Sequence, residues 1–331
     1  MKKEEKTKIA RKNILRRSEE AEGLDVQGYD FNNGVNWEEL LDSFKTTGIQ
    51  ATSLSYAINI VNEMISEKAF IYLGYTSNMV TSGIRDIICY LAEHKKIGVV
   101  VTTAGGIEED IIKCLGKFKI GDFRAKGAEL REKGINRAGN LFIPNSRYCD
   151  FEDFIMPLLE EVYLKQKETG EIITPSKFIW KLGEKINNKD SIYYWCWKNQ
   201  IPVFCPAFTD GSLGDMIYFF KSSHPDFKVD IAEDIWEMNN STLGKEKTGI
   251  IILGGGVIKH HICNANMFRN GADYAIYINS APEFDGSDSG ALPEEAVSWG
   301  KIAVDAKRVK VYGDASIIFP LIVAKTFAKK E

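Results

Sequence analysis

The chain alternates short apolar runs with longer stretches of helical periodicity, and this alternation sets the expected architecture. Six runs rich in Val, Ile and Tyr are typical of buried strands: 69–75, 97–103, 201–207, 249–255, 274–279 and 309–314. Four stretches show helical spacing of apolar residues: 77–94, 152–168, 230–240 and 315–330. Strands that are apolar throughout and alternate with helices indicate a parallel sheet covered on both faces. The pattern predicts a doubly wound α/β fold with a mostly parallel sheet.

No repeat, low-complexity tract or Pro-rich linker divides the 331 residues. We therefore expect one α/β catalytic domain over 27–331, preceded by an arm over 1–26. The first twenty residues carry eight Lys/Arg against four Asp/Glu, so the arm is basic and is expected to be mobile or helical. It lacks the interleaved aromatics of a nucleic-acid patch, and its glutamates argue against a mitochondrial transit peptide.

Composition places the chain among ordinary globular proteins, with 44% hydrophobic and 27% charged residues. No stretch approaches the roughly 20 apolar residues of a membrane helix, and the N-terminus lacks the apolar segment of a signal peptide. These features predict a cytoplasmic protein that binds neither membrane nor nucleic acid. The six cysteines form no CxxC pair and are expected to be buried reduced thiols. With only four histidines, no spacing fits a zinc site, and no metal is expected.

Small and polar residues follow each predicted strand, where ligands bind in doubly wound folds. Two of these turns are Gly-rich, TTAGGIEED (102–110) and GGGVIKHH (254–261). Glycines at a strand-to-helix turn admit a phosphate to the backbone amides, although they equally serve tight helix–strand packing. GGGVIK matches only the first two glycines of G-x-G-x-x-G, so any Rossmann-like nucleotide site here is non-standard. Glu108 and Glu109 are candidates for ribose hydroxyls or ordinary partners of a helix dipole.

The segment EFDGSDSGALPEEAVSWGKI (283–302) places five carboxylates ahead of a single lysine, Lys301. A solvated acidic loop, followed by a surface lysine that begins a strand, is the ordinary interpretation. The alternative is a cation site beside a reactive amine.

Six longer segments resemble one known family, deoxyhypusine synthase, over about residues 27–330. They are GYDFNNGVNWEELLDSFKTTGIQAT, LGYTSNMVTSGIR, VTTAGGIEED, PAFTDGSLGDM, ILGGGVIKHHICNANMFRNGADYAIYIN and the acidic segment itself. The resemblance implies an NAD-dependent aminobutyltransferase. Such enzymes oxidise and cleave spermidine, release 1,3-diaminopropane, and hold the 4-aminobutyl group as an imine on a lysine. They then transfer it to one lysine of the translation initiation factor 5A precursor.

Residue roles carry over by position in these motifs. The implied catalytic residues are Lys301 and His260. The implied spermidine-binding residues are Glu108, Glu109, Asp215, His260, Gly286, Ser287, Asp288, Glu295, Trp299 and Lys301. The implied NAD-binding residues are Ser77, Asn78, Met79, Val80, Thr81, Thr103, Ala104, Gly105, Glu109, Asp210, Gly255, Ser280, Ala281, Asp285, Asp314 and Ala315.

Chemistry agrees with this assignment, because spermidine carries about three positive charges at neutral pH and requires carboxylates and aromatic faces. The resemblance also implies a homotetramer with sites at a dimer interface, and an arm that folds over a neighbouring subunit's site. Leu292 and Ala303 stand where basic residues are expected, which leaves fine substrate preference open. Three alternatives remain: homospermidine synthase with putrescine as acceptor, an inactive regulatory paralogue, and a plain NAD-dependent dehydrogenase or sirtuin-like deacylase.

Overall fold

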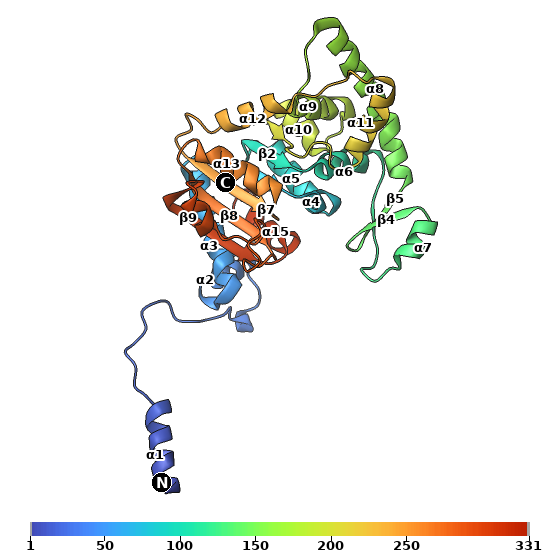
Figure 1. The fold of residues 1–331 in the computed structure, drawn as a ribbon. Coiled ribbons are helices and arrows are strands. Elements are labelled where there is room, and N and C mark those ends of the chain that lie inside the picture. Colours follow the sequence, from blue (N-terminus) through green and yellow to red (C-terminus); the bar gives the residue numbers. More distant parts are fainter. Residues whose placement is uncertain (1, 330–331) are drawn as a thin grey trace.

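The computed structural model describes residues 2–329 and contains a six-stranded, wholly parallel sheet (Figure 1). Its strands run in the order β6-β2-β1-β7-β8-β9. Their bounds are β1 Phe70–Tyr75, β2 Val99–Thr102, β6 Val203–Phe204, β7 Thr248–Leu253, β8 Ala272–Asn279 and β9 Ile302–Tyr312. Counted along the chain, this is the 3-2-1-4-5-6 order of dinucleotide-binding folds, with its switch point between β1 and β7. The strand order is therefore standard, and what departs from the common fold is a long insertion before β6.

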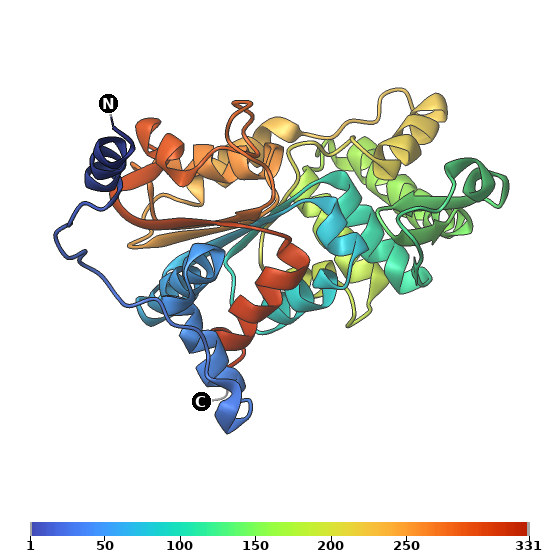
Figure 2. The ribbon, with the colours of Figure 1, turned by 90° about the horizontal axis from the view of Figure 1, so that it is seen from below.

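Helices cover both faces of the sheet, which explains why its strands are apolar throughout. On one face, Ile71, Leu73 and Tyr75 of β1 join a core with α3 (Ile49–Ser66), α5 (Ile84–Glu93) and α15 (Ala315–Lys325). On the other, Tyr72 joins a core with α12 (Ile231–Asn240), α13 (Val257–Met267) and α14 (Pro293–Ser298). Figure 2 shows the sheet between these layers.

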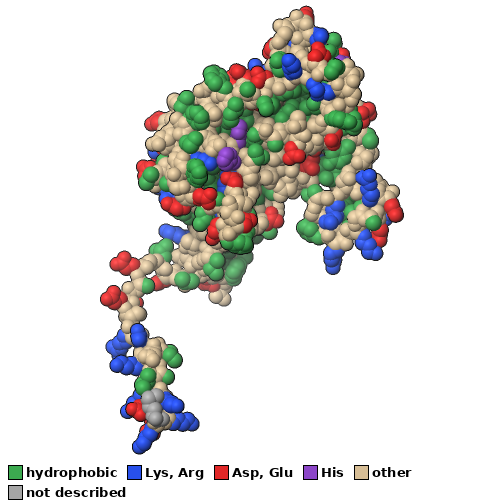
Figure 3. All heavy atoms as spheres, in the orientation of Figure 1, with side chains coloured by type: hydrophobic (Ala, Val, Ile, Leu, Met, Phe, Trp, Pro, Cys, Tyr) green, Lys and Arg blue, Asp and Glu red, His purple; other side chains and the backbone are tan. Residues whose placement is uncertain are grey.

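The insertion between β2 and β6 extends the first core beyond the sheet edge. Its helices are α6 (Ala104–Leu115), α7 (Gly127–Glu132), α8 (Ser146–Thr169), α9 (Pro175–Ile186) and α10 (Ile192–Asn199). A small antiparallel sheet, β3 (Lys119–Ile120), β5 (Leu141–Pro144) and β4 (Ile135–Ala138), projects from it with α7. Lys and Arg side chains gather on this projecting lobe (Figure 3).

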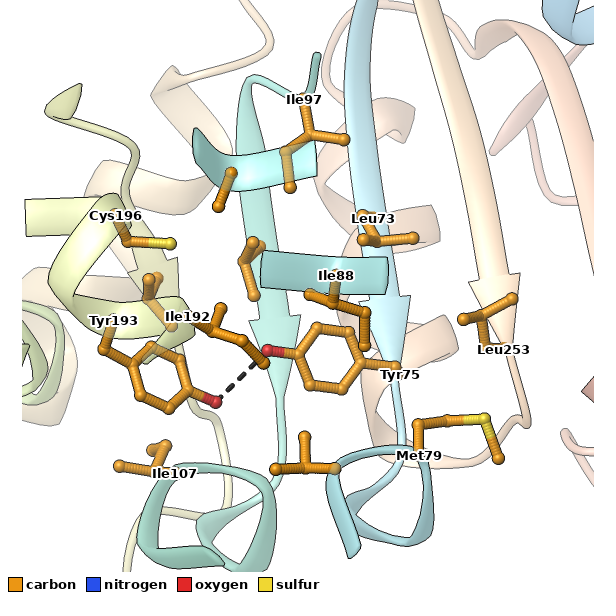
Figure 4. Close-up of a cluster of buried hydrophobic side chains, with 14 of the residues drawn as sticks. Leu73, Tyr75, Met79, Ile88, Ile97, Ile107, Ile192, Tyr193, Cys196 and Leu253 are labelled. Atoms are coloured by element: carbon orange, nitrogen blue, oxygen red, sulfur yellow. Dashed lines mark hydrogen bonds between the residues drawn. The ribbon is translucent and has the colours of Figure 1, made fainter. Parts of the chain in front are cut away.

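A buried tyrosine pair ties the insertion to the central strand, as Figure 4 shows. The hydroxyls of Tyr75 on β1 and Tyr193 on α10 lie 3.1 Å apart. The Tyr193 hydroxyl donates a 2.8 Å hydrogen bond to the carbonyl of Gly106. It therefore accepts from Tyr75, and the first turn of α6 is held against the end of β1.

Three sequence expectations need correction. The helix expected over 77–94 is two helices, α4 (Ser77–Thr81) and α5, because the Ser82 hydroxyl accepts from the N–H of Ile84 across the break. The strand expected over 309–314 begins at Ile302. Of the six cysteines, expected to be buried, Cys149 is exposed and Cys114 half-buried, because they lie on helix sides that face outward.

The remaining elements lie before β1 or directly after β6. The helix α1 (Lys3–Ile14) has no buried residue and stands apart from the sheet, joined by an exposed segment (Figure 1). It is followed by the short helix η1 (Phe31–Asn33) and by α2 (Trp37–Thr47), and α11 (Ser212–Ser223) follows β6. Within residues 2–329, no helix has the length and apolar character needed to cross a membrane.

Candidate active site

The strand ends named from the sequence lie next to one another at the carboxyl end of the parallel sheet. The N–H of Thr76, after β1, donates to the carbonyl of Leu253 at the end of β7. Gly254 is next to that carbonyl, and its own carbonyl accepts a 2.9 Å hydrogen bond from the side chain of Asn279 at the end of β8. The N–H of Gly313, after β9, donates to the Asn279 carbonyl. The carboxyl ends of β1, β7, β8 and β9 therefore form one continuous surface at the switch point, which we call the switch-point ledge.

The predicted NAD-binding residues line this ledge on both sides of the switch point. Ser77–Thr81 form α4, and Thr103–Gly105 begin α6. Thr103 Oγ1 is buried and has no hydrogen-bond partner within residues 2–329, so a polar atom here is left for a ligand. An added Cβ on Gly105 would lie 2.8 Å from the Cβ of Ser77, so the two turns approach closely. An unpartnered hydroxyl beside a helix N-terminus fits a dinucleotide.

Two of the predicted NAD residues also have structural roles. The Asp314 carboxylate accepts a 2.8 Å hydrogen bond from the N–H of Ser316 and so caps α15. An added Cβ on Gly255 would lie 2.6 Å from Cα of Ser289, so this glycine admits the loop that follows β8. The close packing at Gly255 is therefore between turn and loop, and the expected helix–strand packing stays untested there.

A first group of candidate acids lies beyond the β2 and β6 ends. Glu108 Oε2 accepts a 2.7 Å hydrogen bond from the N–H of Leu213 and so caps α11, whose N-cap residue is Gly211. Burial raises the pKa of Glu108. Asp110, two residues after Glu108, is fully buried, and Arg85 Nε lies 2.7 Å from its Oδ1. Asp110 is therefore a structural partner rather than a ligand.

Glu108, Asp210 and Asp215 face an open cleft of about 540 Å³ that we call the acid cleft. Its lining is Glu108, Asn136, Asn145, Tyr148, Thr209, Asp210, Gly211, Ser212 and Asp215. Sequence reasoning found the three carboxylates but not Asn136, Asn145 or Tyr148, which the insertion contributes. Burial, followed by the charges of Glu109 and Glu108, raises the pKa of Tyr148 to about 12, so its phenol stays neutral beside them. Asn136 and Asn145 lie in the segment GINRAGNLFIPN (134–145), whose short strands give no periodic signal that would have identified them.

Glu109 supplies a prediction about stability. Burial raises its pKa to about 7, against the lowering effect of a hydrogen bond donated by Thr81. Between about pH 4.5 and 7 the folded state therefore holds a proton that the unfolded state has lost, and stability falls as pH rises through this range. We expect Glu109→Gln to raise the free energy of unfolding by about 2–3 kcal/mol at about pH 8.5, with little change at about pH 5.

Urea denaturation at both pH values measures this difference. The exposed Glu132→Gln on α7 is the control and should change stability little at either pH. An equal effect of Glu109→Gln at both pH values would contradict the assignment.

The second group of candidates lies on the acidic loop (281–291), α14 and the start of β9. Four of the five carboxylates have partners. Glu283 accepts from the Tyr312 hydroxyl, and Glu294 lies 2.6 Å from Arg308 Nη2. Asp285 accepts a 2.8 Å hydrogen bond from the N–H of Ser287. Asp288 Oδ2 is buried, lies 3.9 Å from Lys259 Nζ and has no hydrogen-bond partner within residues 2–329. The acidic segment is therefore partly an ordinary solvated surface, and its buried Asp288 oxygen keeps an unused capacity to accept a hydrogen bond.

Lys301 is held by its main chain while its side chain remains accessible. Its N–H donates to the carbonyl of Ala296 over 3.0 Å, and its carbonyl accepts from the N–H of Ala272 over 3.1 Å. Gly300 makes the turn before it, with a φ of +70° that favours glycine. The Lys301 Nζ lies 5.4 Å from the centre of the Trp299 ring. The Lys301 side chain therefore starts from a main chain fixed by hydrogen bonds, and its amine lies beside an aromatic ring.

The two adjacent histidines differ in their surroundings. His260 is exposed in the first turn of α13, and its Nδ1 lies 3.2 Å from the Asn264 side-chain nitrogen. Burial lowers the pKa of His261 to about 4, and this ring lines a separate cavity with Phe204 and Ile235. Histidine side chains are visible at the surface over α13 in Figure 3. Only His260 is thus free to meet a ligand at the surface.

The two groups do not meet within one chain. Among residues 2–329, no hydrogen bond or ion pair joins the acid cleft to Lys301, Asp288 or Glu295. The cleft lies beyond the β6 edge of the sheet, whereas Lys301 precedes β9 at the opposite edge (Figure 1). Three large apolar side chains beside the second group are exposed: Phe284, Trp299 and Val304.

Comparison with known proteins supplies the family context. Residues 39–326 match the model of a family described as deoxyhypusine synthase. The chain is 54% identical over 324 residues to a probable deoxyhypusine synthase of Dictyostelium discoideum, covering 92% of this chain and 86% of that protein. It is 51% identical over 350 residues to homospermidine synthase 2 of Senecio vernalis, covering 97% and 95%. A crystal structure of a candidate deoxyhypusine synthase from Entamoeba histolytica superimposes with a TM-score of 0.65 and 37% identity, covering 92% and 97%.

Proposed function

Because the chain belongs to the deoxyhypusine synthase family, we propose that its two groups of candidate residues form one spermidine site when two copies associate. The reaction of this family is a transfer of the 4-aminobutyl group of spermidine, and the chain is an enzyme of this type. The acceptor that we propose is one lysine of the translation initiation factor 5A precursor.

The observation that carries this proposal is the position of Lys301 beside Trp299, directly after a segment rich in carboxylates. In that segment Asp288 has a buried oxygen without a hydrogen-bond partner among residues 2–329, and this oxygen lies 3.9 Å from Lys259 Nζ. A carboxylate oxygen that can still accept a hydrogen bond is suited to an ammonium group of a polyamine, and an indole face suits its carbon chain. The lysine can then attack the imine carbon that forms when spermidine is oxidised, once its own amine is neutral.

The acid cleft of a second copy completes the site in this proposal. Asp215 and Asp210 are exposed there and form no ion pair with any of residues 2–329, so they are available to the far amine of spermidine. Association of two copies around Lys301 would also cover Phe284, Trp299 and Val304, whose exposure is unusual for a monomer surface. The family's tetramer would contain two such dimers.

His260 is the residue that we assign to proton removal from the secondary amine of spermidine. Its ring is exposed at the start of α13, and Asn264 fixes its orientation. The switch-point ledge with Thr103 and Ser77 would hold NAD. When bound, NAD would accept a hydride from spermidine and return it after transfer, so that the reaction has no net redox change.

Incubation with spermidine that is labelled in its 4-aminobutyl group tests the choice of acceptor. We expect label in the factor 5A precursor and release of unlabelled diaminopropane, with no net NADH. The similarity to homospermidine synthase 2 makes putrescine the competing acceptor, and label only in homospermidine would overturn the proposal. Accumulation of NADH without diaminopropane would instead identify a dehydrogenase.

A further inference from the structure

Two buried lysines lie beneath the acidic loop, and neither belongs to the predicted site. Lys259 lies on α13 and is 3% exposed, and Lys310 lies on β9 and is 7% exposed. A lysine is almost never fully buried unless its ammonium group is paired. The partners of these two ammonium groups therefore indicate what the lysines do.

Both ammonium groups donate to main-chain carbonyls of the acidic loop. Lys259 Nζ donates to the carbonyls of Asp288 and, over 3.2 Å, of Ala291, and it lies 3.9 Å from the side-chain Oδ2 of Asp288. Lys310 Nζ donates over 2.6 Å to the carbonyls of Ala281 and Gly290. Each lysine also lies over an aromatic ring, with Nζ 4.7 Å from the centre of Tyr277 for Lys259 and 4.1 Å from Tyr312 for Lys310. Four carbonyls at the two ends of the loop are thus held from below.

Apart from these lysines, a side-chain contact between the loop and the sheet is the hydrogen bond that the Tyr312 hydroxyl donates to the exposed Glu283. Residues 282–287 are exposed, and the internal hydrogen bonds of the loop are short-range turns. Its close approach to itself depends on Gly290, where an added Cβ would lie 1.8 Å from the carbonyl oxygen of Pro282. Charge-assisted hydrogen bonds are about twice as strong as neutral ones. The two lysines are therefore the main restraint on where Asp285 and Asp288 stand.

We propose that Lys259 and Lys310 are positioning residues that hold the main chain of the acidic loop in its substrate-binding conformation. This inference rests on the proposed function for its consequence, since it assumes that Asp285 and Asp288 bind NAD and spermidine. The lysines themselves do not touch the substrate. They preorganise the carboxylates, so that binding does not have to order the loop. Their positive charges also offset the concentration of carboxylates above them.

Substitution by methionine tests the proposal, because methionine has a similar length and no charge. We expect Lys310→Met and Lys259→Met each to raise the KM for spermidine about tenfold while kcat changes less than about threefold. We also expect faster hydrogen exchange at amides of 282–291 in the free protein, with unchanged exchange in β7 and β8. Lys310→Arg should restore part of the KM, because it keeps the donor.

The control is Lys325→Met. Lys325 is equally buried and donates over 3.0 Å to the carbonyl of Glu38, far along the chain from the loop. We expect it to lower the melting temperature without changing the KM or loop exchange. Wild-type KM and loop exchange in both loop variants would overturn the proposal, as would faster exchange throughout the protein. The exchange experiment needs no substrate, so it tests the clamp even where the wild-type protein fails to cleave spermidine and the proposed function falls.

Discussion

Lys301→Ala is expected to abolish covalent capture of the aminobutyl group and to reduce deoxyhypusine formation roughly 10³-fold or more. The Lys301 Nζ lies 5.4 Å from the centre of the Trp299 ring, and the residue follows the carboxylate-rich segment 283–295. Borohydride added during turnover reduces an imine to a stable amine. Label from spermidine should then map to the peptide that contains residue 301 in the wild-type protein and should be missing from the variant.

Lys301→Arg is the sharper variant, because it keeps the positive charge but cannot form the imine at neutral pH. It should be as inactive as Lys301→Ala. Lys307→Ala is the matched control, since Lys307 lies on β9, which Lys301 directly precedes. It is exposed, and within residues 2–329 its ion pair is with Glu63 at 2.5 Å. It should trap label like the wild type. Normal modification of the acceptor by Lys301→Ala would eliminate the imine mechanism.

The sheet was predictable because strands buried on both faces are apolar along their length. The edge strand was the exception: β9 begins at Ile302, but Asp305, Lys307 and Arg308 interrupt its apolar pattern. Edge strands commonly carry such charges, and their local sequence then resembles a loop. The strands β3, β4 and β5 of the insertion are two to four residues long, too short for periodicity to detect.

The positions of candidate site residues depend partly on local sequence. The turn at Gly300 and the strand after it place Lys301, and the acidic segment led us to expect a cation site, which stays a prediction. The sequence does not show which group each carboxylate contacts in the folded chain. Glu294 pairs with Arg308 on the next strand, and Glu108 caps α11 from more than one hundred residues away. Those assignments depend on tertiary contacts, as does the separation of the two halves.

Mixing two inactive variants should restore activity when the site is built from two chains. Asp215→Ala removes a carboxylate from the acid cleft, and we expect a loss of about 10- to 100-fold at low spermidine. Lys301→Ala removes the amine of the other half. In a dimer that contains one copy of each, one site carries both changes and the other site is intact. Random association gives mixed dimers in about half of cases, so about a quarter of wild-type activity should return.

The control pairs two variants of the same half, Lys301→Ala with Glu295→Ala. Every site in such a mixed dimer keeps one damaged group, because each lysine half carries one of the two changes. Activity should therefore be about the mean of the two variants and should not rise above that of the more active one. Co-expression with two affinity tags isolates the mixed species. The measurement is the rate of acceptor modification per mixed dimer, where one intact site of two should give about half of wild-type activity. A mixed dimer of Asp215→Ala and Lys301→Ala that remains inactive would place both halves in one chain, against the separation of the acid cleft from Lys301.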